Sequence, residues 1–171
     1  MIILGIDPGT ATTGFGVVEK QGSKVIHIAH GVIRTPKEDP IEIRLLSIYD
    51  QMNVLLEAHK PDSVAVEKLF FGNNVTTALT VGRSVGVILL ATAQHKLPCM
   101  EYRPNEVKMA VTGYGAAEKQ QVQQMVKQLL SLATIPKPDD AADALAIAIC
   151  HAHSAHLMAL NQAVARRPYP K

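Results

Sequence analysis

Four acidic residues, far apart in the chain, each stand where an apolar segment ends or begins. Asp7 closes an apolar run near the N-terminus, Glu67 closes a second run, and Asp140 and Asp143 open an alanine-rich apolar stretch. Because apolar runs of these lengths fold as buried strands or helices, the four carboxylates can converge only in the folded chain. Together they would form an anionic, oxygen-rich pocket of the kind that suits Mg²⁺.

Apolar periodicity and turn residues predict the order of the elements. We expect strands over residues 2–7, 14–19, 24–34, 63–67 and 97–102, and helices over residues 41–59, 75–96, 105–111, 117–132 and 140–159. The first three strands follow one another with short turns, which favours an antiparallel meander. Strands that then alternate with helices predict an α/β domain with a mixed sheet over residues 1–158, followed by a short, basic, flexible tail over residues 159–171.

Composition limits where such a chain works and what it binds. A net charge of +2 means that any nucleic-acid-binding surface is a local patch, because the chain has no overall basic field. Cys99 and Cys150 lie in apolar segments without metal-ligand spacing, as expected for buried thiols in a reducing compartment. The longest wholly apolar stretch, residues 85–91, is too short to cross a bilayer. With no signal peptide visible, we expect a soluble cytoplasmic protein without a membrane partner.

The segment that begins at Asp7 and continues through Pro8, Gly9 and Thr10 has three interpretations. An acid at the carboxyl end of a strand lies where open α/β sheets bind their ligands. Asp, Pro and Gly are equally common in turns that have no function. A third interpretation, the phosphate loop of actin-like and sugar-kinase ATPases, requires a duplicated domain and a much longer chain.

Asp140 and Asp143 also have two interpretations, which can both hold. At a spacing of three residues they share one side of a helix, so that one cation could contact both. Acids at a helix start are also favoured as caps and by the helix dipole, and Asp139 could serve as the cap equally well. His151 and His153 point to different sides of the same helix, so we expect carboxylates to be the metal ligands.

Aromatic and basic residues are candidates for contact with DNA. Phe70 and Phe71 lie in a Gly/Asn-rich connection after Glu67; we assign Phe70 to contact with an unstacked base and Phe71 to anchoring the loop. Lys108 and Lys119 are candidate phosphate contacts, although a solvated helix face is the simpler explanation. The further basic candidates are Lys127, Arg83 and Arg103.

The expected helix over residues 75–96 is apolar on more than one side and carries Gly82 and Gly86, which would let a partner backbone approach closely. A homodimer and a fully buried central helix both account for this pattern.

The order and spacing of these motifs resemble the RuvC family of crossover junction endodeoxyribonucleases over residues 1–156. The matching motifs are Gly5-Ile-Asp-Pro-Gly-Thr10, Val66-Glu-x2-Phe70, Val107-Lys108, Ala117-Glu-Lys119 and Asp140-Ala-Ala-Asp-Ala-Leu-Ala-Ile-Ala148. The resemblance implies a ribonuclease-H-like fold and a homodimer. It also implies Mg²⁺-dependent, paired nicking of Holliday junctions in recombination and repair, alongside a branch-migration helicase complex.

The resemblance also assigns roles to residues. The family's four catalytic, metal-binding acids fall on Asp7, Glu67, Asp140 and Asp143; its junction-contacting aromatic falls on Phe70, and its two functional lysines fall on Lys108 and Lys119. Two Mg²⁺ ions are expected in each active site, with Mn²⁺ as an alternative. They would activate the attacking water and neutralise the leaving oxygen of an in-line displacement at phosphorus. The competing hypotheses are a smaller ribonuclease-H-like enzyme that acts on RNA and a junction- or nucleotide-binding module with a vestigial site.

Overall fold

The structure, a computed structural model, describes residues 1–68 and 75–165. Its strands are β1 (Ile2–Asp7), β2 (Thr12–Gln21), β3 (Lys24–Arg34), β4 (Ser63–Glu67) and β5 (Cys99–Tyr102). Its helices are α1 (Ile41–His59), α2 (Val75–Gln94), α3 (Pro104–Thr112), α4 (Lys119–Leu129) and α5 (Asp139–Ala165). The expected mixture of strands and helices is therefore present, in the expected order.

The strands form one mixed sheet in the order β3-β2-β1-β4-β5. The first three pair antiparallel, which confirms the opening meander. β4 lies parallel to β1 and β5 lies parallel to β4, each reached through a helical crossover. The ends of β1 and β4 that carry Asp7 and Glu67 consequently lie side by side.

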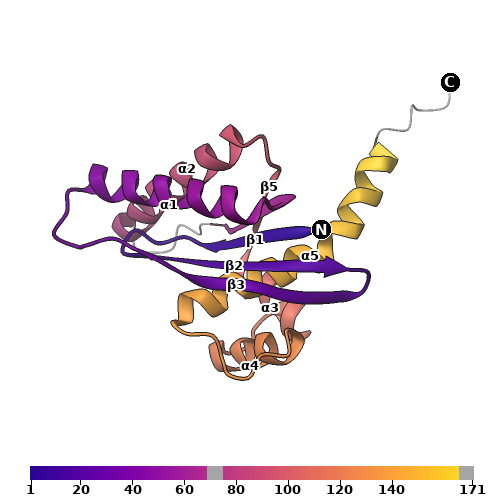
Figure 1. Cartoon of the computed structure of the whole chain (residues 1–171). Helices are drawn as coiled ribbons and strands as arrows, with labels where there is room; N and C mark the ends of the chain where they lie inside the picture. Colours follow the sequence, from indigo (N-terminus) through magenta and orange to yellow (C-terminus); the bar gives the residue numbers. More distant parts are fainter. Residues whose placement is uncertain (69–74, 166–171) are drawn as a thin grey trace.

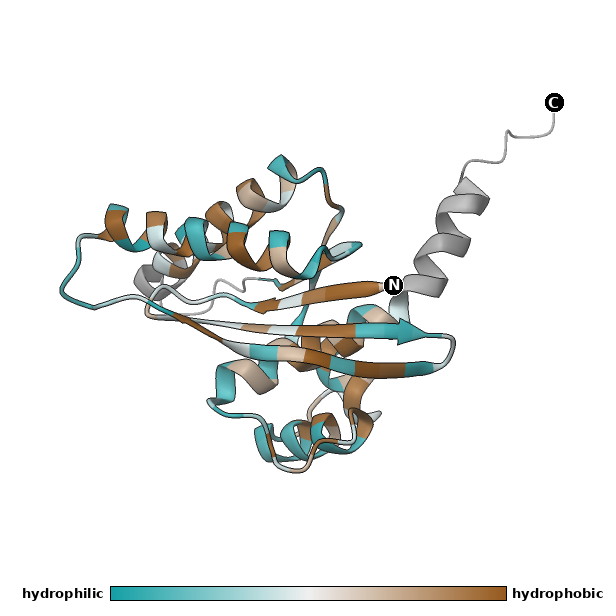
Figure 2. Cartoon of the chain, in the orientation of Figure 1, coloured by the Kyte–Doolittle hydropathy of each residue, from teal (hydrophilic) through white to brown (hydrophobic). Residues whose placement is uncertain are grey.

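Helices cover both faces of the sheet (Figure 1), with α1 and α2 on one face and α3, α4 and α5 on the other. Each face has its own buried cluster, one around Leu4, Val17 and Met52, the other around Ile3 and Leu145. Apolar residues run along the middle of the strands in Figure 2, where both sides of the sheet are covered. Burial on both faces explains why the strands read as continuous apolar runs.

Alternation along the strands places the two strand-end acids on one face. In β1, Leu4 and Ile6 belong to the cluster under α1 and α2, so Asp7 projects to the opposite face, toward α5. In β4, Ala65 packs in the cluster under α5, and Glu67, two residues on, shares its side. Both carboxylates thus face the helix that begins with the aspartates.

Most element boundaries agree with those expected, and the differences have local causes. Gly113 (φ 77°) ends α3, and α4 begins only at Lys119, where the Glu118 backbone N–H donates to the Gln121 side chain. α5 is longer than expected and continues to Ala165, beyond the predicted end at residue 159. Its apolar sequence carries no break there, whereas the arginines that suggested a tail begin only at residue 166.

Both cysteines are free thiols; Cys150 is buried as expected, but Cys99 is only half-buried. Within the described residues, no helix has the length and hydropathy that a membrane crossing needs.

Candidate active site

The four predicted acids face one another where β1, β4 and the first turn of α5 meet. Asp7 is largely enclosed, and burial together with the charges of Glu67, Asp143 and Asp140 raises its pKa to about 8. Burial and the charge of Asp143 likewise raise the pKa of Glu67. Burial and mutual repulsion therefore both oppose full ionisation of these carboxylates.

Lys119, the first residue of α4, supplies part of the missing positive charge. Its Nζ lies 3.0 Å from Asp143 Oδ2 and 3.5 Å from Asp139 Oδ2. Partial burial opposes the charge on Lys119, but these two carboxylates outweigh it and raise the pKa of the ammonium. Burial raises the pKa of Asp143 even so, and Lys119 limits the rise. The lysine is half-exposed, so this contact is one that a substrate or a cation can replace.

Lys108, on α3, stands on the side of Glu67. Burial and the charge of Asp143 raise the pKa of Glu67, and the charge of Lys108 limits this rise more than that of Lys119 does. Lys108, Lys119, Glu67 and Asp143 all line one pocket beside the carboxylates. Both predicted lysines therefore border the acid site.

Glycines allow α5 to approach the sheet closely enough to bring its aspartates to Asp7. A Cβ at Gly14, the pairing partner of Asp7, would lie 2.0 Å from the backbone oxygen of Asp140. A Cβ at Gly16 would lie 2.7 Å from the backbone nitrogen of Leu145. Side chains at these positions would push the helix away from the strands. The glycines in β2 therefore determine how near the four acids come to one another.

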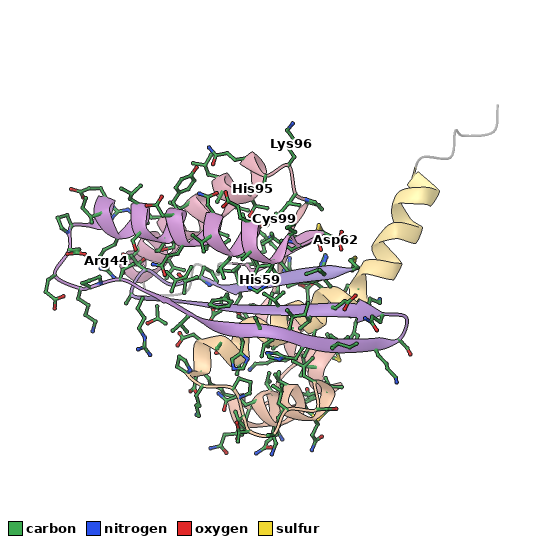
Figure 3. All side chains as sticks on the ribbon, viewed as in Figure 1. Arg44, His59, Asp62, His95, Lys96 and Cys99 are labelled. Atoms are coloured by element: carbon green, nitrogen blue, oxygen red, sulfur yellow. The ribbon has the colours of Figure 1, made fainter. Side chains whose placement is uncertain are left out.

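A buried hydrogen-bond network holds the turn that follows Asp7. Thr10 Oγ1 donates to the Thr80 carbonyl at 2.9 Å and lies 3.0 Å from Ser84 Oγ, both on α2. The Thr10 carbonyl accepts from Thr35 Oγ1 at 2.6 Å, and Arg44 Nε donates to Thr35 Oγ1 at 2.9 Å. Arg44 is labelled at the beginning of α1 in Figure 3. The turn thus joins the strand that carries Asp7 to α2 and α1.

His151 belongs to a separate buried cluster. Its Nε2 lies 2.9 Å from Ser63 Oγ and its Nδ1 lies 2.8 Å from the Tyr102 hydroxyl. Burial, followed by the charge of Lys20, lowers the pKa of this imidazole. The cluster satisfies polar groups between α5 and the sheet.

The donor set of the acid site fits a hard divalent cation, because it consists of carboxylate oxygens under mutual repulsion. Among the side chains that the structure describes, no three histidine, cysteine or acidic groups form a ready-made cation site. Ligand geometry therefore requires some adjustment of the carboxylates, beginning with Asp143, which is paired with Lys119.

The structure brings together Asp7, Glu67, Asp140 and Asp143, with Lys108 and Lys119 at their edge. Asp139 instead pairs with Lys119 and with Lys137, whose Nζ lies 3.0 Å from Asp139 Oδ1. Phe70 and Phe71 lie outside the described residues. The sequence alone did not predict that Thr10 joins the Asp7 turn to α2 or that Gly14 and Gly16 let α5 approach β2. Glycines within an apolar strand do, however, signal close backbone approach.

Comparison with known proteins identifies the family. The family model described as "Crossover junction endodeoxyribonuclease RuvC" matches residues 3–151. The chain belongs to this family. The RuvC protein of Desulfitobacterium hafniense (strain DSM 10664 / DCB-2) is 55% identical over 92% of this chain and 96% of its own. That of Heliobacterium modesticaldum is 57% identical over 90% of this chain and 95% of its own.

A solved structure agrees with the sequence relatives. Thermus thermophilus RuvC in complex with Holliday junction substrate superposes with a TM-score of 0.88 at 36% identity, over 92% of this chain and 96% of that one. The fold is therefore the ribonuclease-H-like mixed sheet of the RuvC resolvases, as the motifs implied.

Proposed function

We propose that this protein is a divalent-metal-dependent endonuclease that resolves four-way DNA junctions by paired symmetric nicks. The observation that carries the proposal is the enclosed Asp7 carboxylate, surrounded by three further acids and bordered by two lysines. Its family relatives are crossover junction endodeoxyribonucleases, and one solved relative holds a Holliday junction.

The four acids would hold two Mg²⁺ ions, with Mn²⁺ as an alternative. When bound, the metal would activate water and neutralise the leaving oxygen in phosphodiester hydrolysis. Asp7, on which the charges of the other three carboxylates act, would be the central ligand of this set. Because its pKa is about 8, Asp7 has to lose its proton before it can bind a cation near neutral pH.

Lys119 has a double part in this proposal. While it pairs with Asp143, its ammonium supplies the positive charge that the acids need. Were Asp143 to hold a cation instead, Lys119 would be free to contact a phosphate oxygen. Lys108, on the Glu67 side, would contact the backbone from the other direction. Such contacts position the strand without reading its sequence.

A homodimer matches the two-fold symmetry of a junction and would place one site on each of two like strands. α2 supplies a surface for it, because Leu79, Arg83, Gly86 and Leu90 are exposed and recur at helical spacing on one side. Leu79 and Leu90 are 57% and 55% exposed, so α2 is not the fully buried helix of the competing interpretation.

Sedimentation tests the dimer. Leu90→Glu on α2 should give a monomer that keeps the wild-type melting temperature. Leu129→Glu, which charges an exposed leucine on α4, is the matched control and should leave a dimer. A Leu90→Glu protein that still sediments as a dimer would remove α2 from the interface.

Phe70 remains assigned to an unstacked base at the crossover. The branch-migration helicase complex and the cytoplasmic location also remain predictions.

One cleavage assay separates the proposed function from its alternatives. A four-way DNA junction, a linear DNA duplex and a structured RNA are each incubated with and without Mg²⁺. We expect paired nicks in the junction alone, dependent on metal and absent in Asp7→Asn. Cleavage of the RNA instead would favour the smaller ribonuclease-H-like enzyme. Junction binding without cleavage under any metal would indicate a vestigial site.

A further inference from the structure

A small pocket, which we call the slot, opens directly beside the acids and has a volume of about 250 Å³. Its charged members are Glu67, Asp143, Lys108 and Lys119, and its remaining lining is apolar. The apolar lining residues, which we call the slot floor, are Pro104, Val107, Val122, Ala146 and Ile147. Val107, Val122, Ala146 and Ile147 are at most 7% exposed and belong to the core under α5, so the floor is fixed by packing.

The place of the slot limits what can occupy it. Two of the proposed metal-binding acids, Glu67 and Asp143, form part of its wall. A group in the slot would therefore lie next to the phosphate that is hydrolysed at the acid site. The groups bonded to a phosphate in a nucleic-acid strand are its two flanking sugars. The volume is below the range of about 300–1,000 Å³ typical of pockets for drug-sized ligands, which suits a group of sugar size.

We propose that the slot receives the deoxyribose of one nucleotide flanking the scissile phosphate and thereby selects DNA over RNA at the cleaved bond. This inference rests on the proposed function and names the feature that sets its sugar specificity.

The physical reason is the 2′-hydroxyl, a donor and acceptor that distinguishes RNA from DNA. The slot floor offers it no side-chain hydrogen-bond partner. The proposed mechanism commits Glu67 and Asp143 to the metal and Lys108 and Lys119 to phosphate, so no charged group of the lining is left to pair with it. A ribose in the slot would therefore bury an unpaired hydroxyl, which is unfavourable, whereas a deoxyribose presents only C–H at that position.

The test uses junctions that differ in one sugar. At each of the two positions flanking the cleaved phosphate, the 2′-hydrogen is replaced in turn by hydroxyl or by fluorine, and single-turnover cleavage is measured. Fluorine alters the sugar pucker as ribose does but donates no hydrogen bond. We expect the hydroxyl at one of the two positions to slow cleavage at least ten-fold, about 1.4 kcal/mol, and fluorine there to have little effect.

A matched pair of variants locates the effect. Val122→Thr adds a hydroxyl to the slot floor without changing the side-chain shape and should narrow the ribose-to-deoxyribose difference. Val126→Thr makes the same change one turn further along α4, at a fully buried residue outside the slot, and should leave the difference at the wild-type value. If Val122→Thr fails to fold, Ala146→Ser carries the same expectation from α5.

Binding supplies a readout independent of cleavage. We expect the sugar to enter the slot only when the scissile phosphate is drawn to the assembled acid site, so the Kd of Asp7→Asn for the substituted junction should change less than two-fold. A loss of affinity as large as the loss of cleavage would place the discrimination in the shape of the junction arm and overturn the inference.

Three further results would also overturn it: equal cleavage of ribose and deoxyribose at both positions, an equal loss with fluorine, or an unchanged ribose-to-deoxyribose difference in Val122→Thr. Failure to cleave the all-DNA junction would instead contradict the proposed function itself.

Discussion

Replacement of Gly14 by alanine tests whether close packing of α5 on the sheet assembles the acid site. The added Cβ would lie 2.0 Å from the Asp140 carbonyl oxygen, whereas ordinary contact begins at 3.4 Å. The first turn of α5 would therefore have to retreat by about 1.4 Å, the difference between these distances. The obstacle is backbone, so no side-chain rotation relieves it, and Asp140 and Asp143 move away from Asp7.

Two magnitudes follow. Overpacking of this kind costs roughly 1–3 kcal/mol of stability. A displacement of about 1 Å in a catalytic group can cost on the order of 100-fold in rate. All four acids remain in Gly14→Ala, so we expect at least a 100-fold loss of junction cleavage and a higher Mg²⁺ requirement in a protein that is folded and still binds the junction.

Cleavage across a Mg²⁺ titration, a melting curve and a junction-binding isotherm decide the matter. Gly115→Ala is the matched control, because the Cβ added there meets its nearest atom at 3.4 Å, an ordinary contact, and it should behave as wild type. Wild-type cleavage and Mg²⁺ dependence in Gly14→Ala would refute the view that glycine in β2 sets the position of the aspartates.

Further predictions concern charge, hydrogen bonding and pH. Burial and three neighbouring acids raise the folded-state pKa of Asp7 to about 8 from 3.8, so its ionisation destabilises the fold as pH rises through that window. In chelator, Asp7→Asn should therefore melt higher than wild type at pH 8, with the difference shrinking toward pH 5. Lys108→Ala and Lys119→Ala should each flatten the salt dependence of junction binding by about one charge. Unchanged slopes would show that these lysines are solvated surface residues that do not contact phosphate. Thr10→Val should lower kcat while junction binding stays normal, and Thr10→Ser should keep the wild-type kcat. Equal rates in wild type and both variants would show that the hydrogen bonds from Thr10 to α2 do not position Asp7. Burial lowers the folded-state pKa of His151 below 6.5, so stability is lost as pH falls below that value, and His151→Gln should show a weaker loss between pH 7 and 5 by melting temperature.

Local sequence determined most of the elements, because apolar runs and helical periodicity report directly on burial. β1, β3, α1 and β4 have the expected bounds, each delimited by residues such as Gly22 or Lys60-Pro61 that stop a strand or helix locally. The same signals placed Asp7 and Glu67 at strand ends and the aspartates at a helix start. The four acids could therefore be named as candidates before their separation in space was known.

Tertiary structure decided how those candidates meet. Strands buried on both faces carry no alternation in their sequence, so the side to which Asp7 and Glu67 project depends on which helices cover which face. Only tertiary contacts distinguish the three α5 acids: Asp139 pairs with Lys119 and Lys137, whereas the charges of Asp140 and Asp143 act on Asp7. The interactions of Asp140 and Asp143 with Asp7 join residues more than a hundred positions apart, and a pattern read along the chain does not contain them.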